Sequence, residues 1–419
     1  GFQRGISEGL GAVLILLTVG MLIGSWILAG TVPTLIYYGA GLLDARWFYP
    51  ATTLICSLVA VSIGSSWTVA GTLGIGFMGI AASFNLSPEI TAGAIISGAY
   101  FGDKMSPLSD TTNLAAAAGG VDLFAHIRHM GWTTIPAFCG SLALFAMLGH
   151  DPATDGESVQ SLRAALAEEF HLGPQLLLPI VFMLALLLRR ISAYPAILLS
   201  ALFGTLFALL FQQAAVLRLA GDAGTLPRAL LLLKGVWIAL FDGYASSTGD
   251  ADFDELLTKG GMSSMLNTVW LILCALGFGG ILERTGILGV LLARVVAGVG
   301  HIGSLVTRTV LAGFGTNLLC SDQFLAIVLP GRMLRDAYEE LGYSRLNLSR
   351  TIEDSATLTS ALIPWNTCGA YMSATLGVAT FQYLPFAYFN IACPLIAVAL
   401  AWAGIGQKRL SSTPAGETG

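Results

Sequence analysis

Charge is scarce in this sequence, and the scarcity sets its class. Only 11% of the 419 residues are Asp, Glu, Lys or Arg, whereas 55% are hydrophobic and the mean hydropathy is +0.76. Soluble domains carry about 25% charged residues, so a water-soluble protein of this length could not cover its surface with so few. The composition therefore excludes a large soluble core and indicates a membrane protein.

Motifs for metal, redox and nucleic-acid chemistry are also lacking. The six cysteines form no CxxC pair and lie in apolar segments, and there is no HExxH motif. No basic patch interleaved with aromatic residues indicates nucleic-acid binding. No serine nucleophile and histidine base stand in register within an apolar segment. We therefore expect no cofactor, no nucleic-acid partner and no enzymatic activity.

Long uncharged runs are what the sequence has instead. A helix needs roughly 20 apolar residues to cross about 30 Å of hydrocarbon. Runs that meet or approach this length cover residues 9–43, 48–87, 132–148, 174–188, 195–211, 265–282 and 381–406. The sequence thus predicts an all-α polytopic protein embedded in a lipid bilayer.

Loop charges predict an orientation, because loops rich in Lys and Arg face the cytoplasm. Basic segments lie at 126–130, 189–190, 308, 332–335 and 408–409, whereas the loop at 150–171 is acidic. We expect the acidic loop to be external. The C-terminus is then cytoplasmic, and the protein resides in a bacterial inner membrane.

Two apolar stretches carry polar residues at their centres and do not fit a simple crossing. The first, 47–85, contains Gly64-Ser65-Ser66, and the second, 303–332, contains Gly315-Thr316-Asn317 and has basic residues at both ends. Basic flanks on both sides indicate that the chain enters and leaves by the same face. We expect two re-entrant hairpins, whose polar tips must be buried in protein or face a water-filled cavity.

A proline-interrupted helix follows each hairpin. Residues 88–118 contain Pro107 followed by Ser109, and residues 347–378 contain Pro364 followed by Asn366. Proline removes a backbone hydrogen bond and breaks the helix, which would free carbonyl groups near the bilayer centre. Paired interruptions in corresponding places of two halves indicate the binding site of a secondary transporter.

These recurrences divide the chain. We expect a first repeat at 1–172, connecting scaffold helices at 173–250, a second repeat of inverted orientation at 251–407, and a tail at 408–419.

The interrupted helices also carry a family resemblance. SGAYFGDKMSPLSDTTNLA (97–115), SRTIEDSATLTSALIPWNTCGAYM (349–372) and GSSWTVAGTLG (64–74) closely resemble the NhaC-type Na+/H+ antiporters of the ion transporter superfamily. The resemblance implies inverted repeats with re-entrant hairpins, exchange of Na+ for H+, and a homodimer. It also implies one or two further apolar helices before residue 1. Related exchangers swap malate for lactate, so Na+- or H+-coupled transport or exchange of a small organic anion, either a carboxylate or an amino acid, stays open as an alternative.

Acids at membrane depth are the strongest candidates for binding the ions. A charged residue at the bilayer centre costs roughly 2.5–3.5 kcal/mol, so acids are not kept there without a role. The candidates for Na+ or H+ are Asp103, Asp110, Asp322, Glu353 and Asp354. Lys104 offers a structural alternative, since it could form a salt bridge with Asp354 or Asp103.

Neutral oxygens would complete a sodium site, because Na+ requires about five or six oxygen ligands. Candidates are Ser65, Ser66, Thr68, Ser109, Thr111, Thr112, Asn113, Thr316, Asn317, Thr359, Asn366 and Thr367. We expect Na+ to be held chiefly by Asp110, Ser66, Ser109 and Asn113.

One buried carboxylate for which Na+ and H+ compete is sufficient for antiport. We expect this carboxylate to be Asp110. The second repeat should contribute mostly neutral ligands, with Asp354 nearer the cytoplasmic entrance. Because Lys104 is the only basic residue that the sequence places near the site, a dicarboxylate substrate is disfavoured.

Overall fold

The computed structural model describes residues 1–149, 156–221, 226–296, 298 and 300–410. Over these residues the chain is helical, and its only β-type pairings are two isolated bridges. Six of the described helices are long and apolar enough to cross a membrane, or up to eight if each of two bent pairs is one span. The predicted all-α polytopic membrane fold is confirmed.

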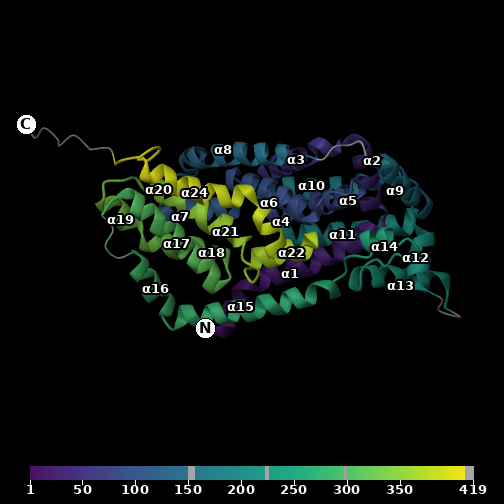
Figure 1. Ribbon diagram of the computed structural model, residues 1–419. Helices are drawn as coiled ribbons and strands as arrows, with labels where there is room; N and C mark the ends of the chain where they lie inside the picture. Colours follow the sequence, from purple (N-terminus) through teal and green to yellow (C-terminus); the bar gives the residue numbers. More distant parts are fainter. Residues whose placement is uncertain (150–155, 222–225, 297, 299, 411–419) are drawn as a thin grey trace, which may run out of the picture.

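The helices follow one another with short connections (Figure 1). In the N-terminal half they are α1 (Phe2–Leu28), α2 (Thr31–Leu42), α3 (Phe48–Ile63), α4 (Ser66–Val69), α5 (Ile75–Ser83), α6 (Pro88–Met105), α7 (Asp110–Gly119), α8 (Leu123–Met147), α9 (Gly156–Glu169), α10 (Leu178–Leu188) and α11 (Ala193–Phe211). The C-terminal half contains α12 (Gln213–Ala220), α13 (Arg228–Phe241), α14 (Ala251–Leu257), α15 (Leu266–Arg284), α16 (Ile287–Val296), α17 (Ile302–Cys320), α18 (Gln323–Met333), α19 (Arg335–Glu340), α20 (Arg345–Ile352), α21 (Leu358–Ser360), α22 (Thr367–Leu376), α23 (Thr380–Tyr383) and α24 (Tyr388–Trp402). Two π-helical turns, Ala70–Gly74 and Glu353–Thr357, join α4 to α5 and α20 to α21.

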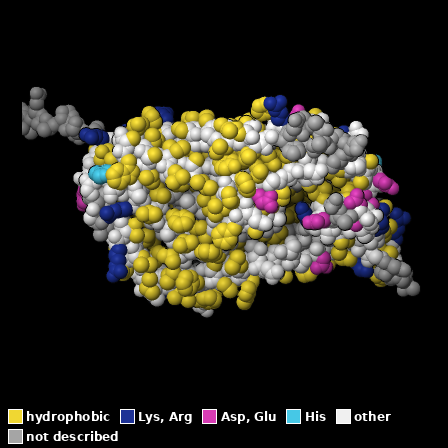
Figure 2. Space-filling view, in the orientation of Figure 1, with side chains coloured by type: hydrophobic (Ala, Val, Ile, Leu, Met, Phe, Trp, Pro, Cys, Tyr) yellow, Lys and Arg dark blue, Asp and Glu magenta, His cyan; other side chains and the backbone are white. Residues whose placement is uncertain are grey.

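The molecule is elongated, and long helices such as α1, α8 and α15 run along its length (Figure 1). Hydrophobic side chains cover the middle of the face shown in Figure 2, whereas charged side chains gather at its two ends. Most of the acidic side chains in view lie towards the end formed by α9, α13 and α14. A hydrophobic belt between charged ends is the surface that a bilayer requires.

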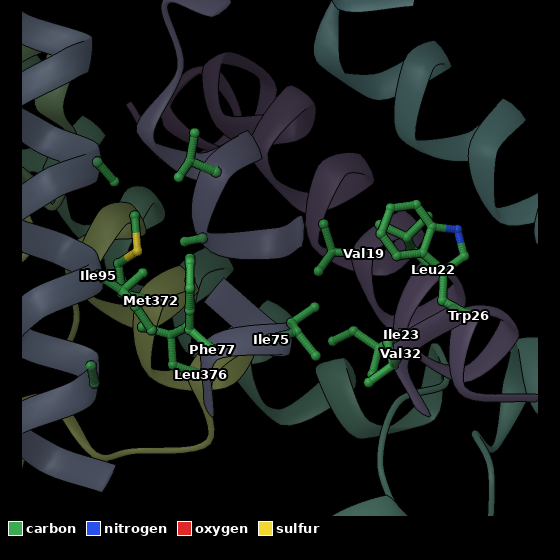
Figure 3. Packing of buried hydrophobic residues seen from close by; sticks show 14 of the residues in the cluster. Val19, Leu22, Ile23, Trp26, Val32, Ile75, Phe77, Ile95, Met372 and Leu376 are labelled. Carbon is green, nitrogen blue, oxygen red and sulfur yellow. The ribbon is translucent and has the colours of Figure 1, made fainter. Parts of the chain in front are cut away.

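The core joins helices that lie far apart in the sequence (Figure 3). Trp26 of α1, Phe77 of α5, Ile95 of α6 and Met372 of α22 all belong to one cluster of buried residues. This packing holds the first interrupted helix against a helix of the second half.

The segment from α3 to α5 folds back on itself. The ring of Phe48, at the start of α3, lies 6.0 Å from that of Phe84, which follows α5, so both ends of the segment meet. The turn is at Gly64, whose φ of 78° is left-handed. A Cβ there would also lie 2.7 Å from the Leu108 carbonyl carbon, so only glycine lets the turn approach the break between α6 and α7.

A second hairpin is formed by α17 and α18, but its turn is not where the sequence analysis placed it. Thr316 and Asn317 lie within α17, and the turn occurs at Ser321 and Asp322, where Ser321 has a left-handed φ of 60°. The expected pairing of Gly315-Thr316-Asn317 with the first turn is therefore wrong by six residues. Ser321 and Asp322 are the residues that match Gly64 and Ser65, because in each pair a left-handed residue is followed by the N-cap of a helix.

The hairpin turns and the helix breaks recur at one spacing. Gly64 and Ser321 are the left-handed turn residues, and Ser109 and Asn366 are the N-caps of α7 and α22. Both 321 minus 64 and 366 minus 109 give 257, and Pro107 and Pro364 keep the same spacing.

A C-terminal strap, residues 406–410, crosses the start of α20. The buried guanidinium of Arg350 donates to the Gly406 carbonyl at 2.8 Å, and the Asn347 side chain both donates to and accepts from the Lys408 backbone. The Leu410 N–H donates to the Gly342 carbonyl. The strap thus satisfies polar groups of the helix that continues into the second break.

Removal of this strap should destabilise the protein. A chain ending at Ile405 leaves Arg350 and Asn347 without these backbone partners, and each buried polar group left unsatisfied costs about 1–3 kcal/mol. We expect a lower midpoint of thermal unfolding in detergent. A chain ending at Leu410 keeps every contact named above and is the matched control; equal midpoints for the two truncations would contradict this role.

Candidate ion-binding site

A cavity of about 670 Å³ lies where the two hairpin turns and the two interrupted helices meet. Its polar lining comes from both halves of the chain: Ser65, Ser66, Thr68, Asp103, Asp110, Thr111 and Asn113 from the first, and Asp322, Gln323, Thr367 and Cys368 from the second. The start of α1 and the turn between α10 and α11 complete its wall. The cavity is thus lined by both turns and both breaks, and not by one hairpin alone.

Asp103 is the carboxylate that joins the first turn to the first break. It lies in the last turn of α6 and is only 6% exposed. One of its oxygens accepts from the backbone N–H of Ser66 at 3.2 Å and from the Ser66 hydroxyl at 2.7 Å, and the other accepts from the Ser109 hydroxyl at 2.5 Å. The hairpin and the broken helix therefore meet on this side chain.

Four helix N-termini lie around the cavity. Ser65, Ser109, Asp322 and Asn366 are the N-caps of the helices that begin at the two turns and the two breaks, and each accepts a backbone N–H through its side chain. The first turn of a helix carries partial positive charge, which favours a nearby anion. Capping side chains thus hold four positive helix ends around one cavity.

Contact between the two halves fixes the first turn in place. The ring of Trp67 stacks on Tyr371 of α22 with a centroid distance of 4.1 Å, and the Tyr371 hydroxyl donates to the Trp67 carbonyl at 2.8 Å. On the other side, the Thr367 N–H donates to the Ser321 carbonyl at 3.0 Å. Each turn is therefore tied to a helix that begins at the second break.

Asp110 has a different position from Asp103. It is the first residue of α7, lines the cavity and is exposed. The carbonyls of Pro107 and Ser109, which the break was expected to free, both accept from the Asn113 amide, at 3.0 and 2.7 Å. These two carbonyls are therefore satisfied within the break itself.

Hydroxyl groups reinforce the break next to Asp103. Thr111 lies 2.9 Å from the Ser109 hydroxyl. Thr112 donates to the carbonyls of both Asp103 and Lys104, at 3.2 and 3.0 Å. Thr68 donates to the Ser65 hydroxyl at 3.0 Å. These residues shape the site around the carboxylate.

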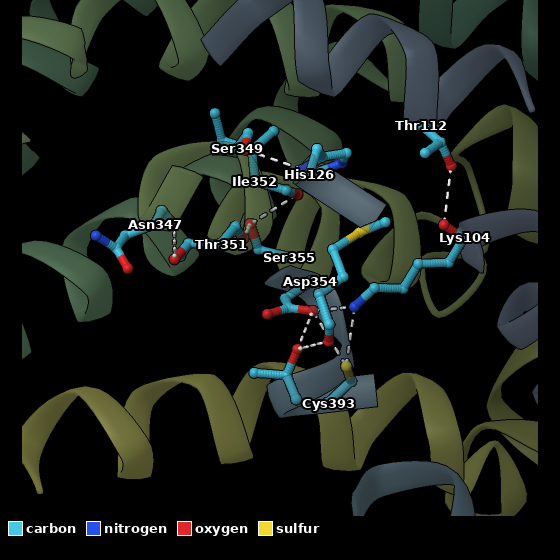
Figure 4. Close-up of polar contacts among 12 residues, drawn as sticks. Lys104, Thr112, His126, Asn347, Ser349, Thr351, Ile352, Asp354, Ser355 and Cys393 are labelled. Atoms are coloured by element: carbon cyan, nitrogen blue, oxygen red, sulfur yellow. Dashed lines mark hydrogen bonds and ion pairs between the residues drawn. The ribbon is translucent and has the colours of Figure 1, made fainter. Parts of the chain in front are cut away.

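Asp354 is fully buried and does not line the cavity; Figure 4 shows its polar contacts. Its carboxylate pairs with the Lys104 ammonium and accepts from the Thr133 hydroxyl at 3.0 Å and the Cys393 thiol at 3.2 Å. The expectation that it stands at a cytoplasmic entrance is wrong, because its helix packs inside the protein against α8 and α24. The alternative of a salt bridge with Lys104 is the arrangement that the structure has.

Glu353 is buried beside the same network. It is fully enclosed, and neither of its carboxylate oxygens has a hydrogen-bond partner among the described residues. It is the C-cap of α20, where this helix passes into the π-helical turn. An ionised carboxylate without donors is costly to bury, so this environment is unlike that of Asp103.

The neutral candidates of the second half serve mainly the protein itself. Thr316 and Thr359 donate to carbonyls one turn earlier, Asn317 donates to the Ala356 carbonyl at 2.6 Å, and Asn366 donates to Asn317. None of these four lines the cavity. Asp322 and Thr367 do, together with Gln323 and Cys368, which the sequence analysis missed.

Arg190 is a further cavity residue that the sequence analysis missed. It follows α10 with a left-handed φ of 62°, and its N–H donates to the Leu187 carbonyl at 2.8 Å. Glycine is favoured at this helix end, and a side chain there costs roughly 1–2 kcal/mol. Arg190 is thus a basic residue at a cavity whose other charged lining residues, Asp103, Asp110 and Asp322, are acids.

Residues 98–405 match the sequence profile of the Na+/H+ antiporter family. The Na+/H+ antiporter NhaC of Alkalihalophilus pseudofirmus is 38% identical over 97% of this chain and 85% of its own length. The malate-2H+/Na+-lactate antiporter of Bacillus subtilis is 36% identical over 96% and 83%, and the arginine/ornithine antiporter ArcD of Halobacterium salinarum is 37% identical over 96% and 81%. With a family match over most of its length and relatives of this similarity, the chain belongs to the Na+/H+ antiporter family.

Proposed function

We propose that the protein exchanges Na+ for H+ across the membrane and that the two ions compete for Asp103. The observation that carries the proposal is the position of this carboxylate, which is buried at the cavity wall and bonded to both the hairpin turn and the helix break. The relatives named NhaC are Na+/H+ antiporters, which supports the assignment. Asp103 thereby takes the role that the sequence analysis gave to Asp110.

The hydroxyls around Asp103 suit both ions. The hydroxyls of Ser66 and Ser109 donate to the carboxylate. When Na+ occupies the site, the same hydroxyls rotate and present lone pairs, so that oxygens of Asp103, Ser66 and Ser109 become ligands, with water from the cavity completing the shell. A protonated Asp103 instead donates to one of the hydroxyls. Na+ and H+ therefore exclude each other.

Access alternates when the hairpins move relative to the scaffold. The cavity is lined by the start of α1 and by the α10–α11 turn, whose arginines the positive-inside rule assigns to the cytoplasm, so the conformation would face inward. The common spacing of 257 residues supports two repeats, and paired helix interruptions are typical of transporters whose repeats have inverted orientation. The positive-inside rule likewise places the C-terminus in the cytoplasm of a bacterium, with the protein in the inner membrane. The superfamily resemblance supports a homodimer, and the exchange needs no cofactor.

A second candidate substrate, a small organic anion, is favoured by Arg190. The guanidinium at the wall of a cavity of about 670 Å³ could bind a carboxylate, and helix N-termini would assist it. Relatives include one antiporter of malate and lactate. In this case the ion at Asp103 would be the coupling ion and not the sole cargo.

Asp103→Asn should abolish Na+-driven proton movement without unfolding the protein, because Asn keeps the size of the side chain but cannot change its charge. Purified protein in vesicles with an internal pH-sensitive dye provides the measurement. A variant that exchanges Na+ for H+ at the wild-type rate and with the wild-type pH profile would refute the role of Asp103.

Asp110→Asn is the matched variant at the second cavity carboxylate. Because Asp110 is exposed, its charge acts through solvent, where such interactions amount to about 0.2–1 kcal/mol. We expect the Na+ concentration at half-maximal rate to rise by no more than about fivefold, with the pH profile retained. Complete loss of exchange in this variant, with Asp103→Asn active, would return the central role to Asp110.

Arg190→Gln tests the organic-anion candidate. A charge-assisted hydrogen bond is worth about 1.5–3 kcal/mol, so its loss should raise the KM for a transported carboxylate about tenfold or more. Na+/H+ exchange without a carboxylate should change little. Arg189→Gln is the control, since Arg189 is exposed and does not line the cavity. Equal effects of the two variants would argue against carboxylate binding by Arg190.

A further inference from the structure

Asp103 and Lys104 are consecutive, yet their side chains serve different parts of the protein. The Asp103 carboxylate lines the cavity and bonds to the first hairpin turn. Lys104 is fully buried and extends into the second half, where its ammonium pairs with Asp354 (Figure 4). Because both residues belong to the last turn of α6, a rotation that moves one side chain must move the other.

The end of α6 is also fastened at its backbone. The Thr112 hydroxyl donates to the carbonyls of both Asp103 and Lys104, so α7 and α6 are joined across the break. One side chain of α7 therefore holds the backbone of both residues, which opposes local fraying of the helix end.

The ion pair connects four elements. Asp354 lies in the π-helical turn Glu353–Thr357 of the second interrupted helix. Its carboxylate also accepts from Thr133 of α8 and Cys393 of α24, and the Cys393 sulfur accepts from Lys104 at 3.2 Å. A π-helical turn is a wide turn that is often found at functional sites. The first break, the second broken helix and two flanking helices thus converge on one buried charge pair.

We propose that Lys104 and Asp354 are a positioning pair that transmits occupancy of the Asp103 site to the second interrupted helix. The pair does not bind the transported ion. Its ammonium replaces a cation permanently, and it moves with Asp103 when the end of α6 adjusts to Na+ or H+. This role rests on the proposed function, and it reassigns Asp354 from ion binding to coupling between the two halves.

Neutral replacements of Lys104 and Asp354 distinguish a pair that transmits ion occupancy from a pair that only stabilises the fold. Removing one partner from a buried ion pair is strongly destabilising, whereas replacing both with neutral groups is often tolerated. Lys104→Met and Asp354→Asn should therefore each lower the unfolding midpoint, and the double variant should recover much of the loss. In the double variant we expect the maximal rate of Na+/H+ exchange to fall about tenfold or more, with the KM for Na+ within about threefold of wild type.

Cysteine reporters in each half test the transmission directly. Leu108 and Phe324 are 39% and 49% exposed, and both line the cavity, one in each half. Each is changed to Cys in a background with the exposed Cys139 and Cys274 changed to Ala, and a water-soluble maleimide is applied with and without NaCl. The same background without a reporter gives the level of unspecific labelling.

We expect NaCl to change labelling at both reporters when Lys104 and Asp354 are intact. With Lys104→Met and Asp354→Asn present, it should change labelling at residue 108 only. A response at both positions in the double variant, with wild-type exchange kinetics, overturns the coupling role. No response at either position in the intact protein refutes Na+ binding at Asp103 and, with it, the proposed function on which the inference rests.

Thr133→Val provides a second route if the double variant does not fold. It removes one hydrogen bond to Asp354 and leaves both charges in place. We expect a reduced maximal rate with an unchanged KM for Na+ and a weaker response at residue 324. An unchanged rate and response would overturn the proposal.

Discussion

An ionised carboxylate buried in a membrane protein needs donors, and the donors of Asp103 bring together the segments that form the site. They come from a hairpin turn and from a helix break, so both must reach the same point. The left-handed turn at Gly64 allows that approach, and Gly98 and Gly102 let α6 pack closely on α3, because a Cβ at either position would overlap atoms of α3. The caps Ser65 and Ser109 then begin the helices whose positive ends face the acid.

The sequence was sufficient to locate the unusual segments but not to rank their side chains. An apolar run with a polar centre, and a proline followed by a capping residue, predicted breaks that the structure has at Ser106–Ser109 and 361–366. Which acid turns inward depends on helix phase at the break. Asp103 lies in the last turn of α6 and is buried, whereas Asp110 begins α7 and is exposed. A proline marks the interruption and leaves that phase undetermined.

Other residues of the site could not be predicted from the sequence, because tertiary packing and not local sequence brings them to the cavity. Arg190 and the start of α1 reach the cavity only because separate helices pack around it, and no local pattern signals this. In the second hairpin, the run from Gly315 to Asp322 contains two polar groups that could form a turn. Thr316 satisfies its hydroxyl within α17 and Asn317 reaches the second broken helix, so the turn falls on Ser321 and Asp322. Side-chain polarity alone does not distinguish these two cases.

Residues at equivalent spacing show that the second half has no counterpart of Asp103. The positions 257 residues after Ser66, Asp103 and Ser109 are Gln323, Ser360 and Asn366. The Ser360 hydroxyl donates to the Thr357 carbonyl at 2.7 Å, and the Asn366 amide donates to Asn317. The second half therefore has a hydroxyl and amides where the first has a carboxylate and two hydroxyls. Asp354, an acid of the second half, is neutralised by its ion pair with Lys104. Because these equivalent positions hold no second carboxylate, the cost of moving the site through the bilayer depends on whether Asp103 holds a cation.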